Sequence, residues 1–209
     1  MEYKELYERG LPKRSEIRRL ERIKFDIKGA KMRGILIFLF CAFVLNASDH
    51  DETQKFMQAV EAFNKGECES AERIYKELAD AGYPDALFNY GWMKEKGQCA
   101  RQDVKGALEL YERAVKSQKP KVRGLASYRL GLLYMTGRGT AQDVGRAKQL
   151  WQLSDSLEYP QAALSLGLYY LQGINEPKNE KEARRYFTRA CDAGLQPACE
   201  LIKNLTTPG

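Results

Sequence analysis

Small and apolar residues recur along this chain in blocks that repeat every 36 to 40 residues. Three segments, starting at Ala86, Ala126 and Ala162, carry a glycine five positions after the alanine and a second glycine six positions later. Their apolar residues are spaced three and four apart, which places them on one face of a helix. A polar stretch leads to a second block, in which an aromatic residue follows an alanine by four positions. The pattern predicts repeated helix pairs, with second-helix alanines and aromatic residues at Ala71 and Tyr75, Ala107 and Tyr111, Ala147 and Trp151, and Ala183 and Phe187.

The ends of these helices have sequence signals of their own. Asp103, Asp143 and Asn179 stand directly before the second helices, where a short side chain with an oxygen acceptor caps free backbone N–H groups. Gly137 permits the positive φ that ends a first helix. The one spacing of 40 residues indicates a four-residue insertion near residues 117–124. A single helix pair cannot bury its apolar stripe alone, so several pairs must stack on one another.

The most complete copy of the pattern runs from Ala126 to Trp151 through Leu130, Gly131, Tyr134, Gly137, Gly139, Asp143 and Ala147. This order of residues resembles the Sel1-like repeat (SLR) family, a relative of the tetratricopeptide repeat. The resemblance extends over about residues 54–205. It implies an all-α, right-handed α/α solenoid of about four helix-pair repeats that serves as a scaffold or adaptor for other proteins.

The resemblance also indicates a binding face. In related helix-pair solenoids the first helices line the concave surface, and positions five and two residues before and after the repeat leucine face into it. With Tyr90, Leu130 and Leu166 as reference, these positions are Asp85, Phe88, Trp92, Glu95, Leu125, Tyr128, Leu132, Met135, Gln161, Leu164, Leu168 and Leu171. Nine of the twelve are apolar, and an exposed apolar strip of that size marks an interface.

We therefore predict that this groove binds an apolar or amphipathic peptide, with Phe88, Trp92 and Tyr128 as anchors. The predicted partner-binding residues are Asp85, Phe88, Trp92, Tyr128, Leu132, Met135, Leu164 and Leu168. The alternative is that these side chains pack against the first helices of neighbouring repeats and belong to the core.

The N-terminal segment has the pattern of an export signal. Residues 34–45 are twelve consecutive apolar residues after a basic flank, too few to span a bilayer but typical of a signal peptide. We expect translation to start at Met32, with residues 1–31 an over-extended reading frame and residues 32–47 a cleaved signal peptide. The remaining divisions are an acidic leader at 48–55, the SLR domain at 56–205 and a tail at 206–209. The alternative keeps residues 1–31 as a cytoplasmic tail on an uncleaved inner-membrane anchor.

The basic charge of the chain lies almost entirely in this segment. Residues 1–33 carry eleven Lys and Arg against six Asp and Glu, whereas the chain from Ser48 onward is nearly balanced. The balance excludes the broad basic footprint of a nucleic-acid-binding protein.

Four cysteines remain after the signal segment. Cys191 and Cys199 lie on either side of a turn that folds two helices antiparallel, and their spacing of eight resembles a bridge in cysteine-rich secreted SLR proteins. Cys68 and Cys99 follow helix-ending glycines in neighbouring repeats, and we predict a second disulfide between them. Free thiols or a metal site are the alternatives, although His50 is the one histidine of the chain and no spacing resembles two close cysteine pairs.

No reactive constellation stands out in the sequence, so we predict no catalytic residue, no metal and no cofactor. The expected function is an exported bacterial interaction protein, periplasmic or secreted, whose partner is an envelope or extracellular protein. The alternative function is a hydrolase of β-lactams or peptidoglycan, because some cysteine-rich SLR proteins have been described in that way. The chain lacks the Ser-x-x-Lys motif of such enzymes.

Overall fold

The computed structural model describes residues 51–206. The predicted start at Met32, the signal peptide at 32–47 and His50 lie outside the described residues. Within 51–206 no helix is long and apolar enough to cross a membrane.

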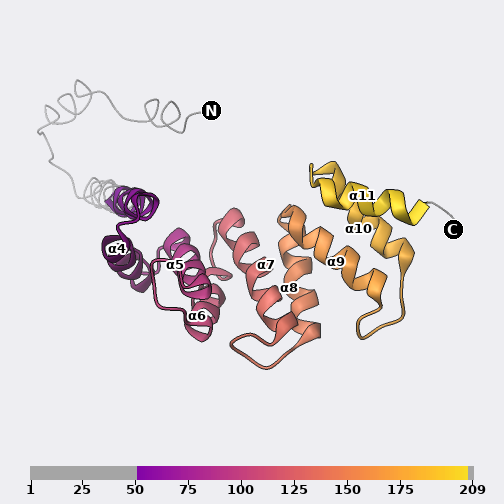
Figure 1. Ribbon diagram of the computed structural model, residues 1–209, viewed down its shortest axis with the longest axis horizontal. Coiled ribbons are helices and arrows are strands. Elements are labelled where there is room, and N and C mark those ends of the chain that lie inside the picture. Colours follow the sequence, from indigo (N-terminus) through magenta and orange to yellow (C-terminus); the bar gives the residue numbers. More distant parts are fainter. Residues whose placement is uncertain (1–50, 207–209) are drawn as a thin grey trace, which may run out of the picture. The chain divides into compact units, whose positions relative to one another are not determined.

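Every regular element of residues 51–206 is a helix. The first helix occupies residues 51–65, and eight more follow it: α4 (Cys68–Asp80), α5 (Pro84–Lys96), α6 (Val104–Ala114), α7 (Pro120–Thr136), α8 (Val144–Ser156), α9 (Pro160–Gln172), α10 (Glu180–Asp192) and α11 (Gln196–Thr206). The helices pack in consecutive pairs, α5 with α6, α7 with α8 and α9 with α10 (Figure 1). The predicted all-α solenoid of helix pairs is confirmed.

The helix ends lie where the sequence signals placed them. The side chains of Asp103, Asp143 and Asn179 accept hydrogen bonds from the backbone N–H groups three residues later, at 2.8, 2.8 and 3.0 Å. Gly137 ends α7 with a φ of +66°, in the left-handed region that glycine adopts without strain. Proline opens each of the first helices α5, α7 and α9, where its missing N–H costs nothing.

A glycine and an aromatic ring meet at the centre of each of these pairs. A Cβ atom added at Gly131 of α7 would lie 2.6 Å from Nε1 of Trp151 in α8. The same relation joins Gly91 to Tyr111, whose Cε1 atom would be 2.9 Å away. Each glycine therefore lets its helix approach the aromatic residue of the partner helix in the same pair.

Both predicted disulfides are present. The Cα atoms of Cys68 and Cys99 are 4.5 Å apart, and those of Cys191 and Cys199 are 4.8 Å apart. The first bridge joins the start of α4 to the loop after α5, and the second joins α10 to α11. Each bridge therefore ties one helix pair to the next helix along the chain.

The helical region begins earlier than the predicted domain boundary at residue 56. Residues 51–55, assigned from the sequence to the acidic leader, are already helical and contact the first repeat. The Thr53 hydroxyl lies 3.3 Å from the Tyr83 hydroxyl, and Lys55 donates to Glu77 at 3.3 Å.

Candidate functional site

The first helices of neighbouring repeats enclose a cavity of about 360 Å³. It lies between the 51–65 helix, α4, α5, α7 and the residue before α9, and we call it the aromatic cavity. Its lining residues are Phe63, Tyr75, Phe88, Asn89, Trp92, Met93, Tyr128, Arg129 and Tyr159. A volume near this value is at the lower end of the range of small-molecule pockets and has room for one or two apolar side chains.

The walls of the aromatic cavity are rings in mutual contact. The centroids of Phe63 and Trp92 are 6.0 Å apart in an edge-on arrangement. On the α7 side, the ring centroids of Tyr128 and Tyr159 are 5.1 Å apart. All four side chains are half-buried, so they present ring surface to the cavity while the neighbouring helices hold them.

Two polar side chains from equivalent positions of their repeats, Asn89 of α5 and Arg129 of α7, interrupt the apolar lining. The Asn89 amide makes no hydrogen bond to any residue in the 51–206 range, which leaves a donor and an acceptor for a ligand. The side chain of Arg129 is 18% exposed, and its guanidinium is already paired with the Glu95 carboxylate.

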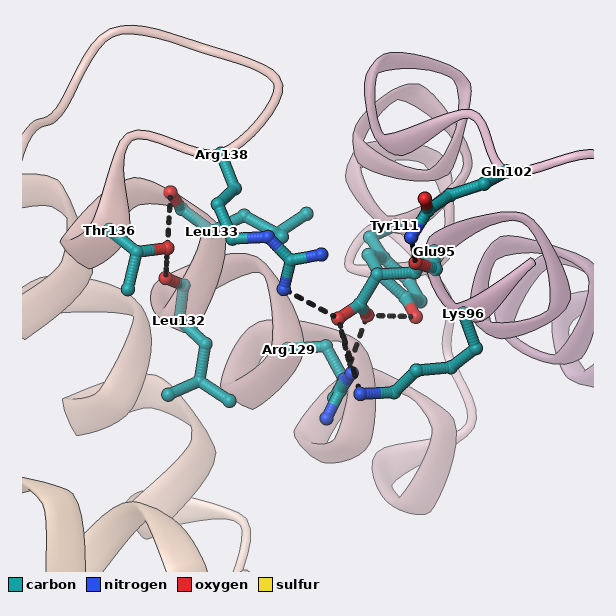
Figure 2. A network of polar contacts seen from close by, with 9 residues as sticks. All are labelled: Glu95, Lys96, Gln102, Tyr111, Arg129, Leu132, Leu133, Thr136 and Arg138. Carbon is teal, nitrogen blue, oxygen red and sulfur yellow. Dashed lines mark hydrogen bonds and ion pairs between the residues drawn. The ribbon is translucent and has the colours of Figure 1, made fainter. Parts of the chain in front are cut away.

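Glu95 holds Arg129 in place from within the protein (Figure 2). Arg129 donates from Nε to Oε2 of Glu95 at 3.1 Å and from Nη2 to Oε1 at 2.5 Å, a bidentate pair. The Tyr111 hydroxyl donates to Oε2 at 2.9 Å, and Nη1 of Arg138 lies 3.7 Å from Oε1. Since Glu95 is only 3% exposed, this carboxylate joins α5, α6 and α7 at a buried junction between two repeats.

The charge around the aromatic cavity follows from this network. Desolvation lowers the pKa of Arg129, but the hydrogen bonds and charge of Glu95 outweigh it and leave that pKa raised. Burial raises the pKa of Tyr111 far above its usual value, and raises that of Tyr75 to about 12. The one cation of the cavity lining, Arg129, is therefore paired within the protein.

Comparison with known proteins identifies the repeats. The Sel1 repeat model matches residues 84–118, 124–154 and 160–195, which are the pairs α5 with α6, α7 with α8 and α9 with α10. The chain is a Sel1-like repeat protein.

Two of its curated relatives are plant proteins of much greater length. The chain is 28% identical over 144 residues, 63% of its length, to the "ERAD-associated E3 ubiquitin-protein ligase component HRD3B" of Arabidopsis thaliana, and it covers 23% of that protein. It is 28% identical over 141 residues, 62% of its length, to the HRD3A component of the same plant and covers 20% of it. The chain thus spans less than a quarter of the curated relatives it matches.

Solved SLR structures share the fold. A Sel1 repeat protein from Oxalobacter formigenes superposes with a TM-score of 0.65 at 24% identity, over 72% of this chain and 62% of that one. A protective antigen of uropathogenic Escherichia coli that displays an SLR fold gives a TM-score of 0.67 at 20% identity, over 76% of this chain and 34% of that one.

The eight predicted partner-binding residues of this SLR protein fall into three groups. Phe88, Trp92 and Tyr128, the predicted anchors, all line the aromatic cavity. Asp85 accepts from Lys119 Nζ at 2.8 Å and lies outside the lining. The four remaining residues are half-buried and pack against a buried cluster that includes Trp151, Leu166 and Phe187; they are Leu132, Met135, Leu164 and Leu168.

The continuous exposed strip that the spacing indicated is therefore absent from the described first helices. Met57 is the one large apolar side chain of residues 51–206 that is mostly exposed, at 53%. Glu95, which the same spacing placed on the groove wall, faces α6 and α7 instead. The leucine positions and the three anchors are alike half-buried, and of the eight predicted residues the anchors alone also line the aromatic cavity.

Six lining residues were not among the predicted binding residues: Phe63, Tyr75, Asn89, Met93, Arg129 and Tyr159. Asn89 and Arg129 stand one residue before the repeat position, where a helical side chain points toward the next repeat. Tyr159 precedes the proline that opens α9, a loop position outside the counted first-helix set.

No group of three or more His, Cys, Asp or Glu residues that could hold a metal ion occurs in the part of the chain that the structure describes. What the arrangement offers is an apolar, ring-lined recess with one free amide. Such a recess can bind a side chain and orient the backbone beside it.

Proposed function

We propose that this SLR protein is an exported interaction module that binds a peptide segment of a partner protein in the aromatic cavity. Phe88, Trp92 and Tyr128 anchor an apolar side chain of the peptide, and the free Asn89 amide bonds to its backbone. The observation that carries the proposal is the convergence of the three anchors on one cavity. Half-buried aromatic residues in a recess are the usual centres of binding energy in an interface.

Membership in the SLR family supports an interaction role, because these repeats are scaffolds for protein assembly. Both plant relatives are components of a ubiquitin ligase assembly, so repeats like these occur within multiprotein complexes. The partner of this chain, under the proposal, is an envelope or extracellular protein.

Two disulfides support export. Disulfides persist in oxidising compartments such as the bacterial periplasm and the extracellular space, and are rare in the cytosol. Under this proposal the mature protein begins near Ser48, and N-terminal sequencing of envelope fractions tests that claim. Recovery of an intact chain that retains residues 1–31 would contradict it.

The binding proposal is tested with short random peptides displayed on phage and selected on the full chain. The Trp92→Ala and Tyr128→Ala variants should each bind the selected peptides about tenfold more weakly, with helicity and melting temperature nearly unchanged. Met57→Ala is the matched control, since Met57 is exposed and outside the cavity. If both cavity variants unfold early and their folded fraction still binds normally, the residues belong to the core and the proposal is wrong.

A further inference from the structure

Basic residues are concentrated around α7 without any acidic residue among them. The thirty residues from Arg113 to Gln142 contain seven Lys and Arg and no Asp or Glu. The chain from Ser48 onward is nearly balanced only when this run is included, and the rest of it is net acidic, so the run leaves a local excess of positive charge beside the aromatic cavity.

The four-residue insertion places part of this run on an additional helical turn. Helix α7 has 17 residues, whereas α5 and α9 have 13 each, and all three end at the equivalent glycine. The extra turn is therefore the first one, Pro120–Arg123, and it extends α7 beyond the start of its neighbours. Lys121 and Arg123 of this turn are exposed.

The extra turn is aligned with the cavity. Lys121 precedes Tyr128 by seven residues, which is two helical turns, so both lie on the same face of α7 about 10 Å apart along the axis. In contrast to Lys119, which pairs with Asp85 at 2.8 Å, Lys121 and Arg123 have no acidic side chain of residues 51–206 within 4.0 Å. Their charge is available to a ligand that occupies the cavity.

From this geometry we infer that the bound peptide is acidic on one side of its apolar anchor. An extended chain advances about 3.3 Å per residue, so the 10 Å between Tyr128 and Lys121 corresponds to about three residues. The inference rests on the proposed function: the peptide carries Asp or Glu about three positions from the apolar side chain that enters the cavity. A peptide suits this site better than a nucleic acid, because the cationic area is one helical turn and the adjoining recess is apolar.

The experiment measures binding of three fluorescein-labelled peptides to the full chain. They share one apolar core taken from the phage selection and differ only in flanks of Glu, Gln or Lys. We expect the Glu peptide to bind about fivefold more tightly than the Gln peptide at low salt, and this advantage to shrink as salt is added. Lys121→Glu should remove the advantage and favour the Lys peptide, whereas the control Lys181→Glu, at an exposed position of α10, should leave the order unchanged.

The outcomes separate the two proposals. Equal binding of the three peptides, with loss of binding in Tyr128→Ala, would keep the cavity function and overturn the charge preference. Failure of all three peptides, together with the parent core, would overturn both. A third outcome is that a single-stranded oligonucleotide binds the chain without displacing the cavity-directed peptides, and that Lys121→Glu abolishes this binding. That result would assign the cations to another ligand and overturn the inference.

Discussion

Replacing Glu95 by alanine removes the carboxylate that joins three helices across a repeat junction. The change leaves the Tyr111 hydroxyl without its acceptor and the Arg129 guanidinium without its counter-charge. The side chain of Glu95 is 4% exposed and that of Arg129 is 18% exposed. Breaking a buried ion pair on one side costs about 3–5 kcal/mol, and we expect about 3 kcal/mol because Arg129 keeps some contact with water.

The chain contains a matched exposed pair. Glu112 accepts from the Tyr134 hydroxyl at 2.9 Å and from Arg146 Nη2 at 3.1 Å, the same combination of phenol and guanidinium. Its side chain is 37% exposed and that of Arg146 is 49% exposed. Surface pairs contribute about 0–1 kcal/mol, so Glu112→Ala should lower the free energy of unfolding by less than 1 kcal/mol.

Urea unfolding followed by circular dichroism measures both variants. Glu95→Ala should also broaden the transition, because the junction couples the α5–α6 repeat to the α7–α8 repeat and helical repeats unfold separately when coupling is lost. The double variant Glu95→Met with Arg129→Leu should recover most of the loss, since an apolar pair removes both buried charges. Equal losses for Glu95→Ala and Glu112→Ala would refute the reasoning.

Three further outcomes are expected. Gly131→Ala should lower stability by about 1–3 kcal/mol in urea unfolding, because the added methyl group overlaps the Trp151 indole and outweighs the gain of about 1 kcal/mol in helix propensity. Replacing Cys68 and Cys99 by serine should lower stability by about 3–4 kcal/mol, since the bridge closes a loop of 31 residues, and should weaken peptide binding because it ties down one wall of the aromatic cavity. Burial raises the pKa of Tyr75 to about 12. The neutral Tyr75 side chain therefore stabilises the fold fully below the ordinary tyrosine pKa near 10, and this stabilisation is lost as the pH rises toward 12. The melting temperature should fall across that range.

Each of these outcomes has a control. Gly145→Ala, where the nearest atom to the new methyl group would be 3.5 Å away, should cost nothing. Serine at Cys191 and Cys199 should cost about 2–3 kcal/mol and leave peptide binding unchanged, because that bridge closes a loop of eight residues between α10 and α11. A stable Gly131→Ala, equal binding in the two serine variants, or a melting temperature that is constant from pH 10 to 12 would contradict the corresponding statement.

The fold was predictable from the sequence because its determinants are local. Three kinds of signal act within one repeat: the Asp and Asn caps, the glycines that end the first helices, and the glycines that face an aromatic ring. The spacing of these residues was therefore enough to locate the helices. The spacing also predicted the insertion near residues 117–124, which forms the additional first turn of α7 in the structure.

The binding face was only partly predictable because exposure depends on neighbouring repeats. The position counting identified Phe88, Trp92 and Tyr128, but it could not separate them from Leu132 and Leu164, which lie outside the lining of the aromatic cavity. How closely successive first helices approach decides which of these side chains is covered, and that spacing is a property of the stack. The buried position of Glu95 has the same origin, because its partners come from two other helices.

The emission of Trp92 during a peptide titration tests the central claim most directly. The chain has two tryptophans, and Trp151 is 4% exposed, so a Trp151→Phe variant isolates the signal of Trp92 in the cavity wall. Peptides selected on the full chain should produce a saturable blue shift of this emission, because an apolar side chain displaces water from the indole, and Tyr128→Ala should weaken the titration about tenfold. Selected peptides that bind the chain but leave Trp92 emission unchanged would contradict the account.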